Sequence, residues 1–423
     1  MKPSALEILS TYFFAIALIH TFSAAAIQRL AQKYKLKSTK GQLLHLFSRL
    51  ELIFGIWAIA LLIVMLFFKG FQGTRAYIEG LNFNEPLFVL TIMLISASRP
   101  VIQFATRVIF FFSRVLPFEK EVALYVSCLT LGPLLGSFIT EPAAMTVTAL
   151  ILRQLYFSKP ISEKLKYGTL AVLFVNISVG GVLTHFAAPP VLMVAYKWNW
   201  DLAYMFNNFG WKALLAVSLN ALAAGHVFKS ELGLLKMDNE PVIPKSSKML
   251  IAAHLCFLIA VVVFAQQPIA FLALLAWFFG LFAITLKHQD ELLLRQSVGA
   301  AFFLAGLVVL GTLQSWWLAP LIISLQSFAL FFGATLLTPL VNSSALTSLA
   351  SQFEPINEGY KYALVSGAVA GGGLSVIANI PNLSGYLILK DSIDKGRMTP
   401  SFLLLAALIP TLISMACFWL PLG

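Results

Sequence analysis

Long apolar runs follow one another along nearly the whole chain. Ten of them have about the length that an α-helix needs to cross the hydrocarbon core of a bilayer, roughly 20 residues. They lie near residues 8–27, 43–68, 86–112, 165–196, 209–228, 248–266, 268–286, 291–313, 361–389 and 399–420. This pattern predicts an all-α polytopic membrane protein with about ten transmembrane helices.

Two further apolar runs, 121–157 and 320–351, are too long for one helix and are interrupted by proline and polar residues. Irregular backbone is tolerated at membrane depth only where protein or a water-filled cavity encloses it. We therefore expect each run to form a re-entrant helical hairpin, which enters and leaves the bilayer on the same side. The runs 165–196 and 361–389 each contain a glycine-rich interruption, which predicts an unwound helix at mid-membrane.

The composition agrees with a membrane protein. Hydrophobic residues make up 59% of the chain, charged residues 11%, and the mean hydropathy is +0.86. The net charge of +11 could point to nucleic acid, but the basic residues lie in short loops between apolar runs. We therefore expect a lipid bilayer and no nucleic acid as partner. The three cysteines are isolated from one another, so neither a disulfide framework nor a resident metal or cofactor is predicted.

The loop charges also predict an orientation. If the loop at 28–42 is cytoplasmic and both hairpins are re-entrant, 21 of the 29 Lys and Arg lie in cytoplasmic loops and 6 in outer segments. This bias obeys the positive-inside rule. It places the N-terminus and the C-terminus outside, in what we expect to be a bacterial inner membrane.

Each half of the chain then holds five spans and one hairpin, so the second half is inserted upside down relative to the first. The first repeat is predicted at 1–228, a cytoplasmic linker at 229–247 and the second repeat at 248–423. The glycine-rich stretches 180–190 and 371–381 align with each other, and the hairpins align with Pro142 opposite Pro339. Inverted repeats with broken helices at their interface are typical of secondary transporters.

Glu141 is the most informative single residue. Of the 18 acidic residues, Glu51 and Glu141 alone fall inside predicted membrane segments and not at the first residue of one, and Glu51 lies beside Arg49 near a helix end. Glu141 has no basic residue within ten positions. A carboxyl group that leaves water ionises less readily, which suits Glu141 to exchange a proton for a cation. The alternative is a protonated glutamic acid that hydrogen-bonds a neighbouring helix.

The hairpin tips and the glycine-rich breaks supply further oxygen atoms that could bind a hard cation. The alternative is that these small residues only let helices pack closely. His185 could relay protons or be structural, and Arg99 could balance Glu141, bind an anion or snorkel. The candidate ion- or substrate-binding residues are Glu141, Thr140, Thr146, Gly180, Gly181, Thr184, Asn342, Ser343, Ser344, Gly372, Ser375 and Asn379.

These motifs resemble the ion transporter superfamily, which includes NhaD-type sodium/proton antiporters, arsenite permeases and divalent anion/sodium symporters. Residues 371–382 are similar to the signature Gly-Gly-x-Leu-Thr-x-Ile-Gly-Asn, and Thr140-Glu141-Pro142 is similar to the hairpin of a small family of proposed sodium/proton antiporters. The resemblance implies two inverted repeats, each with a hairpin and an unwound helix, and a homodimer as in many relatives. The chain departs from the antiporters' usual Asp-Asn pair, because Val341-Asn342 in the second hairpin has no acid.

The sequence thus favours a secondary cation/proton antiporter, with sodium ions and protons as its substrates and Glu141 as the exchanging carboxylate. The alternative function is a sodium- or proton-coupled symporter of a small organic anion. An intramembrane enzyme is not expected, since motifs such as HExxH and paired catalytic aspartates are absent from the sequence.

Overall fold

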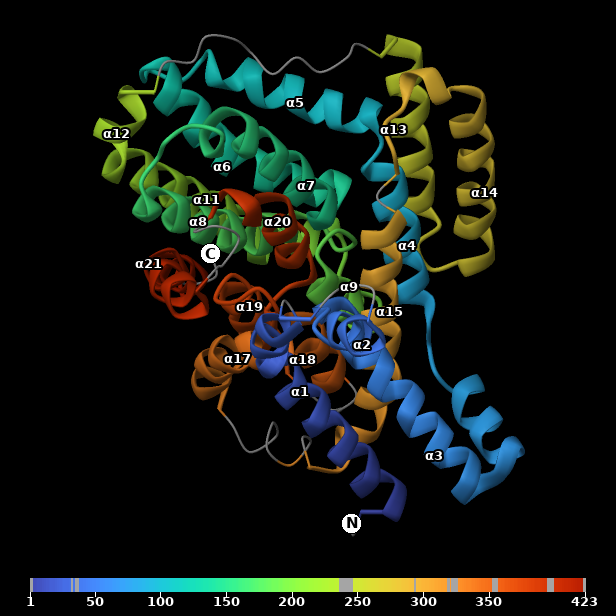
Figure 1. Ribbon diagram of the computed structural model, residues 1–423. Coiled ribbons are helices and arrows are strands. Elements are labelled where there is room, and N and C mark those ends of the chain that lie inside the picture. The colour runs from blue at the N-terminus through green and yellow to red at the C-terminus, as the bar shows by residue number, and fades with distance from the viewer. Residues whose placement is uncertain are drawn as a thin grey trace. The chain divides into compact units, whose positions relative to one another are not determined.

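The computed structural model describes residues 3–31, 33–34, 38–235, 246–292, 294–317, 320, 326–351, 357–393 and 399–420 (Figure 1). All regular elements among these residues are helices, which confirms the all-α prediction. The chain divides into two compact units. The first comprises Met1–Leu90, Leu294–Leu325 and Gln352–Glu354, and the second comprises Thr91–Leu293, Gln326–Ser351 and Pro355–Gly423.

The first unit is built around a close pair of long helices. Its elements are α1 (Ala5–Ala31), α2 (Thr39–Phe47), α3 (Leu50–Glu79), the start of α4 (Asn84–Ser96), α15 (Leu294–Gly311) and η5 (Thr312–Gln314). A Cβ atom placed on Gly306 would lie 2.4 Å from the backbone nitrogen of Gly55, so these glycines let α15 and α3 touch at the backbone. Gly70, with φ 67°, turns the chain inside α3.

The second unit carries the interrupted segments. Its elements are the end of α4, then α5 (Arg99–Ser113), α6 (Lys120–Ile139), α7 (Glu141–Leu152), η1 (Arg153–Phe157), α8 (Glu163–Gly180), η2 (Gly181–Leu183), α9 (Pro189–Ala195), α10 (Leu202–Met205), η3 (Phe206–Gly210), α11 (Trp211–Val227), α12 (Lys229–Gly233), α13 (Lys248–Val263), α14 (Pro268–Ile284), η4 (Leu286–His288), α17 (Ser327–Val341), α18 (Ser343–Ala350), α19 (Glu358–Gly371), α20 (Ile380–Leu389), η6 (Lys390–Ser392) and α21 (Pro400–Phe418).

The predicted span 86–112 is not one straight helix. The structure has α4 and α5 there, bent by 71° at a short break. The local sequence suits the start of a helix, because Pro100 has no N–H and lies in the first turn of α5, while the N-cap residue Ser98 is extended. The run predicted at 86–112 is therefore a bent pair of helices and not one continuous helix.

The other interruptions lie where the sequence predicted them. In the 121–157 run, α6 ends and α7 begins at Thr140, and in the 320–351 run α17 and α18 meet at Asn342. Residues 321–325 of the second run lie outside the described part of the chain. The 165–196 run divides into α8, η2 and α9, and the 361–389 run into α19 and α20.

By length and composition, five described helices could cross a membrane, or six if α4 and α5 count as one span. The five are Glu51–Glu79, Lys120–Ile139, Glu163–Leu183, Ser297–Trp317 and Pro400–Phe418. Shorter apolar helices occupy other predicted ranges, among them α13 and α14. The count of ten spans stays a prediction, as do the repeat boundaries. The predicted linker 229–247 begins with α12, and residues 236–245 lie outside the described part.

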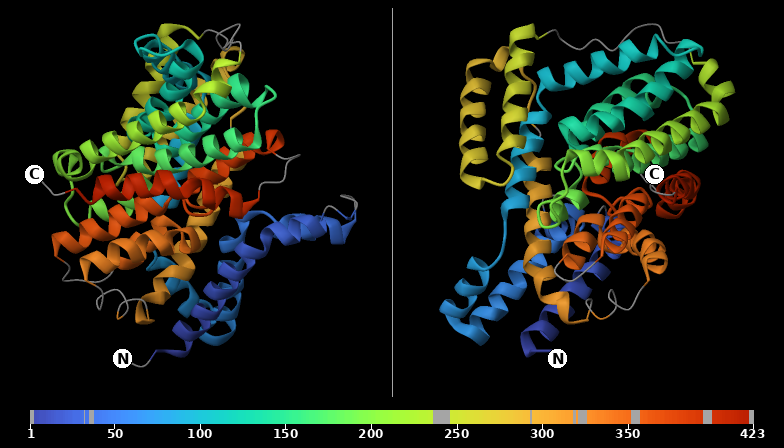
Figure 2. Two further views of the ribbon diagram at one scale, coloured as in Figure 1. Left: turned by 90° about the vertical axis from the view of Figure 1, so that its left-hand side faces the viewer. Right: turned by 180° about the vertical axis from the view of Figure 1, so that it is seen from behind.

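A buried polar network joins four helices of the second unit. The red helix α21 runs beside the green helices α8 and α11 in Figure 2, and both contacts are extensive. The Nδ2 atom of Asn220 donates to Oδ1 of Asn176 (2.9 Å) and to Oγ of Ser414 (3.1 Å). Asn176 in turn donates to the carbonyl of Leu129 on α6 (2.8 Å). Amide side chains therefore fix how α6, α8, α11 and α21 pack.

Lys212, near the start of α11, is fully buried. Its Nζ donates to the hydroxyl of Tyr362 (2.9 Å) and to the carbonyl of Leu420 (2.7 Å). A cation at the carboxyl end of a helix interacts favourably with the helix dipole. Lys212 thereby anchors the end of α21 to α11 and α19.

Replacing Asn220 with leucine should destabilise the second unit by about 1–3 kcal/mol, because the buried amide oxygen of Asn176 and the hydroxyl of Ser414 lose a donor. The melting temperature of the purified protein measures this loss. Asn207→Leu is the matched control, since Asn207 is exposed. Equal melting temperatures for the two variants would contradict a stabilising role of the network.

Candidate functional site

The break between α6 and α7 holds a residue in an uncommon backbone conformation. Thr140 has φ 79° and ψ 149° and is buried. Positive φ is rare for a β-branched residue, and such strain persists only where the surroundings impose it. Pro142, in the first turn of α7, needs no amide partner and so suits the start of this helix. The local sequence thus ends one helix and starts the next with Glu141 at the break.

The carboxyl group of Glu141 is completely buried and bonded to a residue far along the chain. Its Oε2 accepts a hydrogen bond from Nδ2 of Asn379 at 2.7 Å, across 238 positions. The Oδ1 atom of Asn379 accepts from the backbone N–H of Ile380 (3.0 Å) at the start of α20. This second bond fixes the orientation of the amide, because only its NH₂ group then remains to face Glu141.

Two glycines make room for this arrangement. A Cβ atom on Gly181 would lie 2.3 Å from Oε1 of Glu141, so the carboxyl group occupies the space that a side chain would fill. A Cβ atom on Gly180 would lie 2.8 Å from the carbonyl carbon of Pro133 in α6. Close packing, the alternative interpretation of these residues, is therefore one part of their role. The other part is to leave space for the carboxyl group of Glu141.

Ser137, which was not predicted as a site residue, bridges the break between α8 and η2. Its hydroxyl donates to the carbonyl of Gly180 (2.7 Å) and accepts from the N–H of Leu183 (2.9 Å). Thr184 donates to the carbonyl of Ser137 (2.7 Å). These bonds satisfy backbone groups that the end of α8 leaves without helical partners.

The break between α17 and α18 is held in a similar way. Asn342 has φ 77° and ψ 141°, and its side-chain oxygen accepts from the N–H of Ser344 (2.9 Å). The N–H of Ser343 donates to the carbonyl of Ala378 (2.9 Å), within the stretch between α19 and α20. Ser375 donates through its hydroxyl to the carbonyl of Pro339 (3.1 Å). The tip at Asn342 therefore packs onto the second break.

The two broken helices meet at their breaks. The hydroxyl of Ser178 on α8 donates to the carbonyl of Val369 on α19 (2.8 Å). A Cβ atom on Gly372 would lie 2.1 Å from that hydroxyl oxygen, and one on Gly373 would lie 2.5 Å from the Cα atom of Val175. In addition, α7 packs against α20 and α18 against α9. Together with the Glu141–Asn379 bond, these contacts bring both halves of the chain to one buried region.

Several buried oxygen atoms around these breaks have no hydrogen-bond partner within the described part of the chain. They are Oγ1 of Thr140, Oε1 of Glu141, Oγ1 of Thr148, Oγ of Ser343, Oγ of Ser344 and Oδ1 of Asn382. A buried oxygen without a partner is uncommon and calls for a ligand, a proton or water. Hydroxyl, amide and carboxylate oxygens are the ligands that hard cations prefer. Thr146, by contrast, donates to the carbonyl of Pro142 within its own helix (2.8 Å).

His185 and Arg99 lie in other environments. His185 is partly buried, and its ring has edge contacts with the rings of Phe186 and Tyr196. No hydrogen bond joins His185 to Glu141 in the described structure. Arg99 forms an ion pair with Asp290 and donates to the carbonyl of Gln289 (2.8 Å). The guanidinium group therefore has its own partners.

Glu85 is a second buried carboxyl group, which the sequence did not predict. Glu85, in the first turn of α4 and just before the predicted 86–112 run, is 9% exposed. The signal that could have drawn attention to Glu85 is its position beside Pro86 at the edge of an apolar run.

The described ranges hold no cluster of three or more His, Cys, Asp or Glu side chains that could bind a metal ion.

Comparison with known proteins identifies one family. The family model described as "Putative Na+/H+ antiporter" matches residues 5–421, nearly the whole chain. No curated protein matches the sequence.

Gly181→Ala should lower the free energy of unfolding by about 1–3 kcal/mol, because the new methyl group overlaps the carboxyl group of Glu141 and displaces it from Asn379. Gly280→Ala is the control, since a Cβ atom at Gly280 meets no atom within 4 Å. Thermal unfolding in detergent distinguishes the two. A Gly181→Ala protein as stable as the control would show that the carboxyl group does not occupy this space.

Proposed function

Because the chain belongs to the family described as "Putative Na+/H+ antiporter", we propose that this integral membrane protein exchanges sodium ions for protons by alternating access, with Glu141 as the exchanging group. The observation that carries this proposal is the buried bond between Glu141 and Asn379. It leaves Oε1 of the carboxyl group without a partner beside two glycine-rich breaks. A transporter of this family acts on ions and is not an enzyme.

Competition between a sodium ion and a proton for one carboxyl group explains how the two ions are exchanged. An ionised carboxylate without a counter-charge is costly in an apolar interior, so Glu141 must hold either a proton or a cation. In the cation-bound form, Oε1 of Glu141 and the unpartnered oxygens of Thr140, Ser343 and Ser344 supply ligands of the kind that sodium accepts. In the proton-bound form the carboxyl group is neutral. Because both forms use the same oxygen atom, binding of one ion releases the other.

The geometry supports two re-entrant hairpins in inverted repeats. Thr140 and Asn342 have nearly the same φ angles, 79° and 77°, at the two hairpin tips. The bond from Thr184 to the carbonyl of Ser137 has a counterpart in the bond from Ser375 to the carbonyl of Pro339. This correspondence supports a register in which Thr140 lies opposite Asn342, instead of the sequence alignment of Pro142 with Pro339.

In that register Ser343 takes the place of Glu141, because each follows the residue with positive φ. One half of the proposed site therefore carries the exchanging acid, and the other half carries hydroxyl groups. This asymmetry favours a single titrating group. A symporter of organic anions has less support, since Arg99, the cation expected to clamp an anion, is bonded to Asp290 and Gln289.

Glu141→Gln should abolish sodium-dependent proton movement in proteoliposomes to the level of empty liposomes, because glutamine binds a sodium ion weakly and cannot exchange a proton. A pH-sensitive dye inside the liposomes measures the exchange after sodium is added. Glu163→Gln is the matched control, since Glu163 is a largely exposed carboxylate paired with Lys166. Exchange by Glu141→Gln at the rate of this control would rule out the proposed mechanism.

Competition also predicts how pH changes the apparent sodium affinity. Where Glu141 is protonated in the resting protein, lowering the pH by one unit should raise the half-saturating sodium concentration roughly tenfold, because one proton must leave for each ion bound. Initial rates at several sodium concentrations and pH values give this slope. A half-saturating concentration that does not change with pH over the active range would mean separate sites for the two ions.

A further inference from the structure

A long apolar groove lies in the second unit, apart from the two breaks. It has a volume of about 560 Å³ and is lined by α8, α11 and α21. On α21 it extends from Phe402 to Ile413, which at 1.5 Å per residue is a length of about 16 Å. The hydrocarbon region of one leaflet is half of about 30 Å. The groove therefore has about the length of the acyl region of one leaflet.

The groove opens along its side. Ala223 and Val227 of α11 and Phe402 and Ile409 of α21 line it and are exposed. Gly168 of α8 helps to form the opposite wall, because a Cβ atom there would lie 2.7 Å from the ring of Phe228. In an integral membrane protein, an apolar groove with exposed walls faces hydrocarbon chains.

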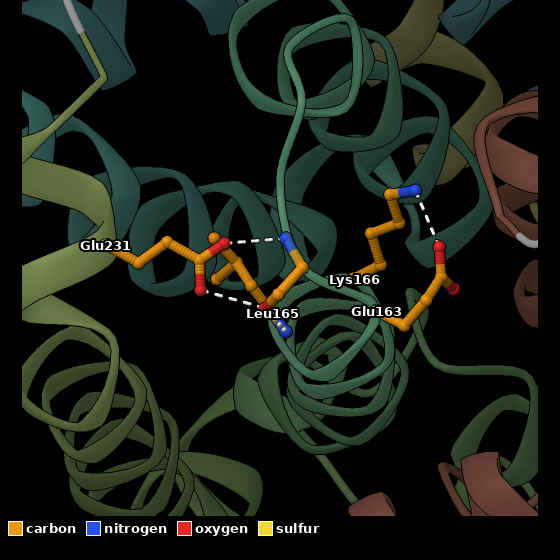
Figure 3. A network of polar contacts seen from close by, with 5 residues as sticks. Glu163, Leu165, Lys166 and Glu231 are labelled. Carbon is orange, nitrogen blue, oxygen red and sulfur yellow. Dashed lines mark hydrogen bonds and ion pairs between the residues drawn. The ribbon is translucent and has the colours of Figure 1, made fainter.

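One end of the groove is polar, and the carboxylate that lines it there, Glu163, already has a partner (Figure 3). Figure 3 shows the ion pair between Glu163 and Lys166, whose charged atoms are 2.7 Å apart. Glu231, drawn in the same view, is bonded as well, because it accepts hydrogen bonds from the N–H of Ser162 (2.6 Å) and from its hydroxyl (2.8 Å). Lys164 lines the same end, is exposed, and forms no ion pair with any residue that the structure describes. Its ammonium group is the charge available to a ligand.

We propose that this groove binds an anionic glycerophospholipid, with one acyl chain between α8, α11 and α21 and the phosphate group on Lys164. The length of the groove, its apolar walls and the position of the free charge fit the two parts of such a molecule.

Filling the groove tests the acyl-chain part of the proposal. Delipidated protein is titrated with dioleoylphosphatidylglycerol, and native mass spectrometry counts the bound lipids. The wild type should retain one lipid, and Ala223→Trp should weaken its binding at least tenfold. Leu222→Trp is the matched control, because Leu222 is also exposed on α11 but does not line the groove. Equal melting temperatures establish that both variants are folded.

The charge is tested separately with Lys164→Gln. This variant should bind phosphatidylglycerol about fivefold more weakly and phosphatidylcholine as the wild type does, since one lysine near anionic lipid contributes a single charge interaction. Lys287→Gln, which changes an exposed lysine outside the groove, should bind both lipids normally.

Three outcomes would overturn the proposal. They are unchanged binding of phosphatidylglycerol by Ala223→Trp, equal affinity of the wild type for the two lipids, and a change of oligomeric state in Ala223→Trp without loss of lipid. The last outcome would assign the groove to a second copy of the chain. None of these measurements depends on transport, so they test the lipid site whether or not the protein exchanges sodium for protons.

Discussion

The structure depends on one constraint: a carboxyl group inside an apolar protein must be neutralised or bonded. Glu141 meets this constraint only in part, through the amide of Asn379, and its second oxygen faces the space above Gly181. Removing a charge from water costs several kcal/mol even after the protein relaxes, so the empty and ionised form of this group is disfavoured. On the proposed mechanism, this cost couples the movement of sodium to that of the proton. Movement of one ion without the other would require the empty, ionised carboxylate, which is the costly state.

The surrounding breaks supply what that carboxyl group needs. Uncommon backbone conformations such as those of Thr140 and Asn342 cost on the order of 1–3 kcal/mol each. Hydrogen bonds across the breaks offset the cost, among them the bonds of Ser137 to Gly180 and Leu183. The helices that end there leave buried side-chain oxygens, among them Oγ1 of Thr140 and Oγ of Ser343, without a partner in the described part of the chain. The network of Asn176 and Asn220 holds the neighbouring helices in place.

Hydropathy and helix-breaking residues located most helices and both kinds of break, because those signals are local in the sequence. The sequence predicted which residues form the site, but not which of them contact one another. Asn379 and Glu141 were both candidates, yet their bond spans 238 positions and follows from how α8 and α19 cross. The burial of Lys212 was not predicted, because a count of loop charges does not report which side chains are buried. The Ser-Arg-Pro stretch that ends at Pro100 could have indicated the bend, but the length of the apolar run around it suggested one helix.

The central claim is that sodium and a proton compete for the carboxyl group of Glu141. The most direct test measures protons released when sodium is added to the purified protein in weakly buffered detergent solution, together with the sodium bound. Competition predicts about one proton released per sodium ion bound by the wild type in the pH range where the group is protonated, and none from Glu141→Gln. Release of the same proton by Glu141→Gln would contradict the account, because the titrating group would then lie elsewhere.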